Sequence, residues 1–323
     1  TNQPSGKMIK VKIMLYDMRS FFKACVELYL TIVGKKAAEI LSKPAPTPFL
    51  SADDKAYDDS EEPRGVLQSK ASKVIMKVLY GARMCRYDLL HACQALACKV
   101  TKWSLRCDRR LHRLIAYIHQ SIDLCMYGWI GDDSIALRLW LYTDADFAAD
   151  QSDSKSVSGV FCALQGPTSF FPLCALSKKQ SSVSHSTCES EMVAADLGLR
   201  TEAIPLMTLL DQLFQREVRC LFLEDNQSTL RNITTGKMAS LRHLSRTHRV
   251  NTHWVAEVSR ELPIDLGACE SHLMAADIFT KMFAENMKWI DVMRLIGHLR
   301  WNDFLTLFNQ GNKSFPEKPK KTT

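Results

Sequence analysis

Apolar residues recur at helical spacing through most of the first 120 positions. A short strand-like run, 9–15, precedes helical patterns over 21–41 and 67–119. The clearest pattern, within 105–119, has apolar residues at i, i+3, i+4 and i+7, which predicts an amphipathic helix. These residues are Leu111, Leu114, Ile115 and Ile118.

From residue 135 the pattern becomes strand-like. Apolar and aromatic runs, several of them bounded by turn residues, are typical of buried strands. The predicted strands cover 136–148, 156–164, 169–177, 218–225 and 262–270. The alternation of these strands with helical patterns predicts an α/β fold with a mixed sheet.

Helical patterns separate the later strands. A long helix is expected from Ser186 to Leu213, because Ser186 and Glu189 fit the capping-box pattern, and Pro205 should break or kink it. A basic helical region over 241–261 and a last helix over 273–283 complete the pattern.

Composition and cysteine usage narrow the class of protein. The 323 residues are enough for roughly two domains, and 46% hydrophobic with 24% charged residues is typical of a globular protein. Eleven cysteines without regular spacing indicate reduced thiols in an intracellular setting. The longest apolar stretch, 21–33, contains Lys23 and Glu27, so no membrane span is expected.

The net charge of +7 is unevenly distributed. An acidic stretch over 51–64 carries six carboxylates, whereas 101–120 and 231–260 are strongly basic. Basic stripes of this kind suit a phosphate backbone, although an ordinary solvated face is the alternative. The arginines predicted to contact nucleic acid are Arg109, Arg110, Arg113, Arg246 and Arg249.

Four acidic residues stand at positions where a fold could bring them together. Asp144 and Asp225 lie at or near the ends of predicted strands, and Glu191 and Asp277 lie within predicted helices. Taken singly each would be a solvated surface acid, but several carboxylates together hold hard divalent cations through oxygen. Such a set suits a two-metal site, with cations ~3.5–4 Å apart, that acts on a phosphodiester.

The segments around these acids resemble the ribonuclease H domain of copia-type (Pseudoviridae) LTR-retrotransposon Pol polyproteins. In that family the motifs read YSDADWAGD, STEAEYMA, CDNQSA and LADIFTK. Here they read YTDADFAAD (142–150), STCESEMVA (186–194), EDNQST (224–229) and AADIFTK (275–281). The resemblance covers about 140–285 in the same order, with Phe147 and Ala149 replacing a usual Trp and Gly.

The resemblance implies a ribonuclease H-like mixed five-stranded sheet flanked by helices, and hydrolysis of the RNA strand of an RNA–DNA hybrid. It implies that Asp144, Glu191, Asp225 and Asp277 are catalytic and hold two Mg²⁺ ions, for which Mn²⁺ can substitute. Asp144 would bridge the two metals, with Asp277 on the nucleophile side and the other two acids on the leaving-group side. Gln227 would contact the hybrid.

Similarity upstream of 135 implies a C-terminal fragment of the polyprotein. The expected parts are a reverse transcriptase remnant (1–50), an acidic linker (51–66), a mostly helical thumb and connection region (67–134), the ribonuclease H-like domain (135–285), and a C-terminal helix with a basic disordered tail (286–323). The polymerase signature Tyr-x-Asp-Asp is missing, so no reverse transcriptase activity is expected from this chain alone.

The expected partners are an RNA–DNA hybrid and, as a candidate, the palm and fingers of an intact polyprotein, with no membrane. The expected location is a cytoplasmic virus-like particle or the nucleus. A decayed or repurposed fragment that only binds nucleic acid remains the alternative. An integrase-type transferase is disfavoured, because its last acid is a Glu on a helix and here it is Asp277.

Three histidines, His243, His248 and His253, recur every five residues, which does not keep one helical face. We expect them at the surface or facing nucleic acid rather than as metal ligands.

Overall fold

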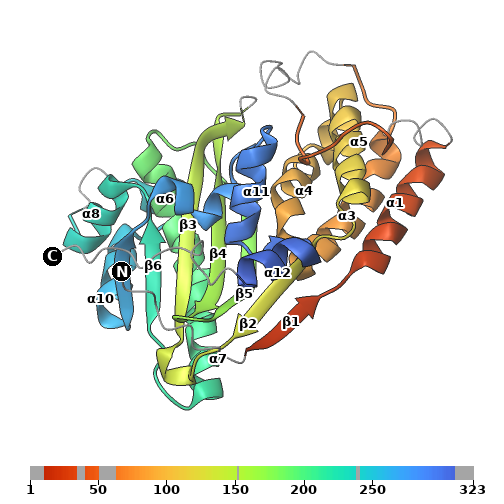
Figure 1. The fold of residues 1–323 in the computed structure, drawn as a ribbon. Coiled ribbons are helices and arrows are strands. Elements are labelled where there is room, and N and C mark those ends of the chain that lie inside the picture. Colours follow the sequence, from red (N-terminus) through yellow and green to blue (C-terminus); the bar gives the residue numbers. More distant parts are fainter. Residues whose placement is uncertain (1–10, 35–40, 51–62, 151–152, 238–240, 310–323) are drawn as a thin grey trace.

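One mixed sheet forms the centre of the protein (Figure 1). The structure, a computed structural model, describes residues 11–34, 41–50, 63–150, 153–237 and 241–309. Most of the predicted acidic linker and the predicted basic tail lie outside these residues. Within the described ranges the sheet has eight strands: β1 (Lys12–Tyr16), β2 (Cys125–Ile130), β3 (Arg138–Asp150), β4 (Lys155–Gln165), β5 (Phe170–Lys179), β6 (Cys220–Glu224), β7 (Ile264–Ala268) and β8 (His298–Leu299).

The strand order is β1-β2-β5-β4-β3-β6-β7, with β8 paired to β2. The pairs from β1 to β3 are antiparallel, and β3–β6 and β6–β7 are parallel. The prediction of an α/β fold with a mixed sheet is therefore confirmed, and its five predicted strands correspond to β3 through β7.

The sheet is larger than the five strands expected. Strands β1, β2 and β8, from outside 135–285, extend it beyond β5 by antiparallel pairing. Strand β2, of sequence CMYGWI, fell within a segment interpreted as mostly helical. A six-residue apolar run has no periodicity that separates a buried strand from a helix, so its pairing partner decides.

Helices cover both faces of the sheet. The α-helices are α1 (Arg19–Val33), α3 (Gln68–Cys85), α4 (Leu90–Ala97), α5 (Leu105–Gln120), α6 (Thr187–Gly198), α7 (Ile204–Phe214), α8 (Gln227–Thr235), α9 (Leu244–Thr247), α10 (Thr252–Glu261), α11 (Asn286–Leu295) and α12 (Trp301–Asn309). Figure 1 shows α1, α3, α4 and α5 as one group on one side of the molecule, with α8 and α10 on the other. None of the described helices has the length and apolar character needed to cross a bilayer.

Shorter helical turns connect these elements. They are η2 (Tyr87–Leu89), η3 (Val100–Lys102), η4 (Ser134–Ala136), the π-helical η5 (Leu199–Ala203), η7 (Ser271–Leu273) and η8 (Ala275–Phe279). The π-helical turn η5 joins α6 to α7 just before Pro205, which has no N–H to donate to the preceding turn. The expected kink at this proline is thus absorbed by wider helical turns.

The predicted last helix over 273–283 is wrong in type. The chain instead forms the two 3₁₀ turns η7 and η8, because Met274 between them is extended. After η8 the hydroxyl of Thr280 donates to the Asp144 carboxylate on β3, so tertiary contact ends the turn.

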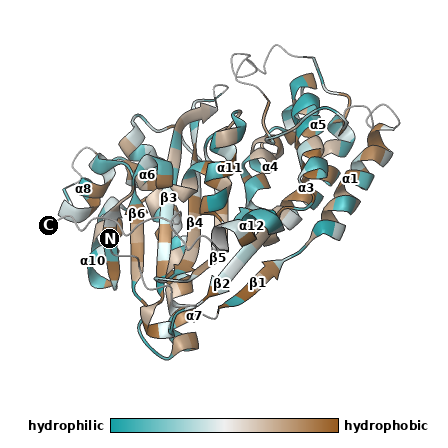
Figure 2. Ribbon diagram, in the orientation of Figure 1, coloured by the Kyte–Doolittle hydropathy of each residue, from teal (hydrophilic) through white to brown (hydrophobic). Residues whose placement is uncertain are grey.

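The alternation of side chains along β3 and β4 divides the core between the two faces of the sheet. Leu139, Leu141 and Val160 pack with α6, α7 and α10, whereas Tyr142 and Phe161 pack with η8 and the helices around α5. Figure 2 shows the central strands as predominantly hydrophobic, with hydrophilic residues on the helices around them.

Candidate metal centre

Strand β6 ends beside the middle of β3, and the two strands bring acidic residues to this edge of the sheet. Their parallel register pairs Tyr142 with Leu223. The next positions place Thr143 beside Glu224 and Asp144 beside Asp225. A hydrogen bond from Thr143 Oγ1 to Glu224 Oε2, of 3.2 Å, agrees with this register.

Helix α6 brings Glu191 to the same edge. The helix begins as its sequence predicted, with the Ser186 hydroxyl accepting from the Glu189 N–H at 3.2 Å. Gly198 allows α6 to approach the sheet, since a Cβ there would lie 2.7 Å from the Thr143 methyl group. Glu191 is consequently 5% exposed.

The turn η8 brings Asp277 from the opposite face. Asp144 on β3 pairs with Gly159 on β4, and a Cβ on Gly159 would lie 2.8 Å from the Ala276 carbonyl oxygen. The glycine therefore leaves the space in which η8 packs directly on the sheet. Asp277 is 9% exposed in this position.

All four predicted acids converge, and a fifth joins them. Asp144, Asp225 and Asp277 form one group of carboxylates, and Glu191, Glu224 and Asp225 form a second. In each group the candidate ligand oxygens lie within 4.8 Å of one another. Asp225 belongs to both groups, whereas the resemblance implied Asp144 as the shared ligand.

Glu224 was not identified from the sequence. It occupies the position of the cysteine in the family motif CDNQSA, and it is fully buried. The available signal was a second carboxylate directly before Asp225 at a strand end. Only the pairing of β6 with β3 places it against Glu191.

A lysine lies among the acids of the first group. Lys281 Nζ donates to Asp277 Oδ1 at 2.8 Å and to Asp144 Oδ1 at 3.3 Å. Burial alone would lower the pKa of Lys281, but the carboxylates of Asp144 and Asp277 outweigh it and raise this pKa above the usual value. The ammonium group stays charged and partly neutralises this group.

Four acids of the centre have raised pKa values and so hold their protons unusually strongly. Burial, with the nearby Glu224 and Asp144 carboxylates, raises the pKa of Glu191 to about 11. Burial and the Asp144 carboxylate raise the pKa of Asp277 to about 7, and the pKa values of Glu224 and Asp225 are also raised, first by burial. Like charges close together in a dry site favour the neutral forms.

The donor set fits divalent cations. Glu191 Oε2 is buried and has no hydrogen-bond partner among the described residues. Buried charges are normally paired or bound to metal, and an all-oxygen set suits Mg²⁺ or Mn²⁺. The residues that would hold the ions are Asp144, Glu191, Glu224, Asp225 and Asp277.

The basic segment after α8 packs against the start of α6. His243 Nε2 is 3.2 Å from Glu189 Oε1, two residues before Glu191 in sequence. Arg246 and Arg249 are exposed on this segment, and Gln227 is exposed at the start of α8. These three side chains are accessible, as a contact with nucleic acid requires.

His248, in the same segment, differs from its predicted surface position. It is 9% exposed, because its ring lies against Ser184, 3.4 Å from the hydroxyl group. The prediction for His253, which is exposed on α10, is confirmed.

The arginines of α5 lie elsewhere. Helix α5 packs on α1 and α4, away from the acidic edge of the sheet (Figure 1). Arg109 is exposed, but Arg113 donates to the carbonyl oxygens of Thr47, at 2.7 Å, and Pro44, at 3.1 Å. Arg110 is half-buried. The predicted basic face is thus only partly accessible, since Arg113 holds the 44–47 segment against the helix.

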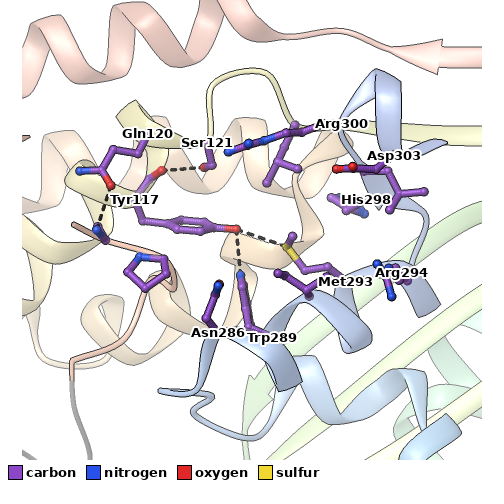
Figure 3. A pocket seen from close by; sticks show the side chains of 15 residues that line it. Tyr117, Gln120, Ser121, Asn286, Trp289, Met293, Arg294, His298, Arg300 and Asp303 are labelled. Atoms are coloured by element: carbon purple, nitrogen blue, oxygen red, sulfur yellow. Dashed lines mark hydrogen bonds between the residues drawn. The ribbon is translucent and has the colours of Figure 1, made fainter. Parts of the chain in front are cut away.

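A separate cavity of about 320 Å³ lies between α5, α11, β8 and α12 (Figure 3). The Tyr117 hydroxyl at its wall accepts from Trp289 Nε1, at 3.1 Å, and donates to the buried Asp88 Oδ2, at 2.8 Å. Among the described residues that line it, Asp303 is the one carboxylate. This cavity therefore lacks the acidic character of the metal centre.

Comparison with known proteins adds no relative from which a function could be transferred. A scan against protein-family models finds no match, and a search of curated proteins finds none. The geometry of the acidic edge therefore carries the functional argument.

Proposed function

We propose that this chain is a metal-dependent ribonuclease of the ribonuclease H type, which hydrolyses the RNA strand of an RNA–DNA hybrid. The observation that carries the proposal is the convergence of Asp144, Glu191, Asp225 and Asp277 from four separate elements. The arrangement of β3 through β7, three antiparallel strands followed by two parallel ones, supports a ribonuclease H-like sheet.

The acids supply what phosphodiester hydrolysis needs. Two divalent ions bound here would activate the attacking water and offset the charge that develops on the phosphate oxygens. Asp144 and Asp277, on the face of η8, would hold one ion, and Glu191, on the face of α6, would hold the other. Asp225 belongs to both groups of carboxylates and could serve either ion. Gln227, two residues after Asp225, is exposed where it can contact the hybrid.

The basic segment beside α6 fits a nucleic-acid substrate. Arg246 and Arg249 are exposed there and can neutralise phosphates as the hybrid docks. The 2′-hydroxyl is the chemical feature by which the RNA strand is distinguished from DNA.

The test is cleavage of an end-labelled RNA–DNA hybrid in Mg²⁺ by the wild type and by Asp144→Asn. Asp291→Asn is the matched control, because Asp291 is an exposed carboxylate on α11. We expect cleavage of the RNA strand by the wild type and the control, and none by Asp144→Asn. A folded wild type that leaves the hybrid intact at every Mg²⁺ and Mn²⁺ concentration would reject the proposal.

One observation favours a second candidate, a protein that binds hybrid without cleaving it. Lys281 already contacts both Asp144 and Asp277, the carboxylates that would have to bind one of the two metal ions. Under this candidate the wild type retains hybrid in a filter-binding assay but shows no turnover with either metal.

A further inference from the structure

Glu224 is a fully buried carboxylate, and it occupies the position of the cysteine in the motif CDNQSA, which the segment 224–229 resembles. Within the part of the chain that the structure describes, each of its oxygens has one donor: Oε2 accepts from the Thr143 hydroxyl and Oε1 from the Asn226 N–H, both at 3.2 Å. A carboxylate oxygen accepts more than one hydrogen bond or metal contact, so both oxygens retain a lone pair. The protein bonds thus orient Glu224 without saturating it.

Glu224 faces Glu191 on the α6 side of the sheet. Their oxygens, with one from Asp225, form a group within 4.8 Å. Glu191 Oε2 is buried there without a hydrogen-bond partner among the described residues. Two buried carboxylates and the half-buried Asp225, with one oxygen that lacks a partner, form a site that a cation would complete, since buried carboxylates are normally paired or bound to metal.

The two groups of carboxylates differ in what already neutralises them. The group of Asp144, Asp225 and Asp277 contains the Lys281 ammonium, at 2.8 Å from Asp277. The group of Glu191, Glu224 and Asp225 has no lysine or arginine ion pair among the described residues. A metal ion that binds the second group therefore has no ammonium or guanidinium group of a described residue to displace.

We propose that Glu224 is a fifth metal ligand and that it forms, with Glu191 and Asp225, a divalent-cation site that fills before the site at Asp144 and Asp277. This inference rests on the proposed two-metal function and deepens it. Each group offers three carboxylates, but a metal ion that binds the first group must also displace Lys281. The order of filling follows from this difference.

The competing description makes Glu224 a neutral acid that shares a proton with Glu191. Gln has the shape and hydrogen-bonding capacity of a neutral Glu but cannot supply a carboxylate ligand. Glu224→Gln therefore separates the two descriptions, and Glu224→Cys restores the residue of the family motif.

The experiment is a titration of the metal-free full chain with Mn²⁺ alone, followed by calorimetry and by the electron paramagnetic resonance signal of free Mn²⁺. We expect two binding events of unequal affinity in the wild type. Both Glu224→Gln and Glu224→Cys should weaken the tighter event at least tenfold, as loss of a group that supports a metal typically does. Glu270→Gln, an exposed carboxylate after β7, should change neither event.

A second variant tests the order of filling without altering Glu224. Lys281→Met should strengthen the weaker event more than the tighter one, because Lys281 contacts Asp144 and Asp277 directly. An unchanged tighter event in Glu224→Gln, or a tighter event that responds to Lys281→Met at least as strongly as the weaker one, overturns the inference. Two Mn²⁺ events without hybrid cleavage would instead reject the nuclease and leave the role of Glu224 standing.

Discussion

Replacing Lys281 with methionine tests whether its ammonium group occupies the place of a metal ion. Methionine keeps much of the length and apolar character of the lysine stem but removes the charge. In the metal-free protein the change deletes two charge-assisted hydrogen bonds, to Asp277 at 2.8 Å and to Asp144 at 3.3 Å. The acids would then face one another without a counter-charge.

The magnitude follows from burial. Removing one partner of a fully buried ion pair costs about 3–5 kcal/mol, and a hydrogen bond to a charged group contributes about 1.5–3 kcal/mol. The side chain of Lys281 is 39% exposed, so solvent screens the pair and the lower range applies. We expect Lys281→Met to lower the free energy of unfolding of the metal-free protein by about 2 kcal/mol.

Divalent metal should reverse this loss, because a cation bound between Asp144 and Asp277 replaces the ammonium group. The assay is urea unfolding followed by circular dichroism, with EDTA or with saturating Mg²⁺, in the wild type and the variant. Lys288→Met is the matched control, since Lys288 pairs with Glu285 on the exposed surface of α11. An equal loss of stability with and without Mg²⁺ would show that Lys281 is a structural residue and refute the reasoning.

Three further predictions concern the pH dependence, the backbone and the basic residues. The pKa of Asp277 is raised to about 7 in the folded protein, against about 4 in the unfolded chain, so the folded state binds a proton more tightly. The metal-free protein should therefore lose stability as pH rises from about 4 to 7. Saturating Mg²⁺ should reduce this slope, measured by urea unfolding. Gly159→Ala should displace the Ala276 carbonyl by steric overlap and weaken Mn²⁺ binding at least tenfold in calorimetry, whereas Gly128→Ala, which meets only a phenylalanine ring, should not. Arg113→Ala should lower the free energy of unfolding by about 1–3 kcal/mol without changing the salt dependence of hybrid binding. Arg246→Ala should leave the free energy of unfolding unchanged and reduce, by about one, the slope of log K for hybrid binding against log salt concentration. The reverse pattern for these two arginines would contradict their assignment.

Some of the site could be predicted residue by residue. The capping pair at the start of α6 places Glu191 on the first turns of the helix, and the apolar run of β6 ends where Asp225 begins. Both features depend on residues within about four positions of one another along the chain. Capping residues and side-chain periodicity therefore reveal them in the sequence. The choice of four acids as a set followed from their motifs.

Other parts of the site depend on contacts between distant segments. Glu224 reads as the last residue of an apolar strand, and its role emerges only because β6 pairs in parallel with β3 beside α6. Lys281 reads as one more surface base, and it reaches the acids because η8 ends in a turn against β4.

The local pattern of apolar and polar residues was thus sufficient to predict the α/β class, the five strands β3 to β7 and the helix α5, whereas the four acids were chosen from their motifs. Tertiary packing decided that β1, β2 and β8 extend the sheet, that Arg113 is engaged by backbone carbonyls, and that a fifth carboxylate joins the centre. The physical reason is that secondary structure follows interactions between near neighbours in the chain. The convergence of the carboxylates depends instead on strand register and on how closely distant segments approach one another. Gly159 and Gly198 permit this close approach at the acidic edge of the sheet.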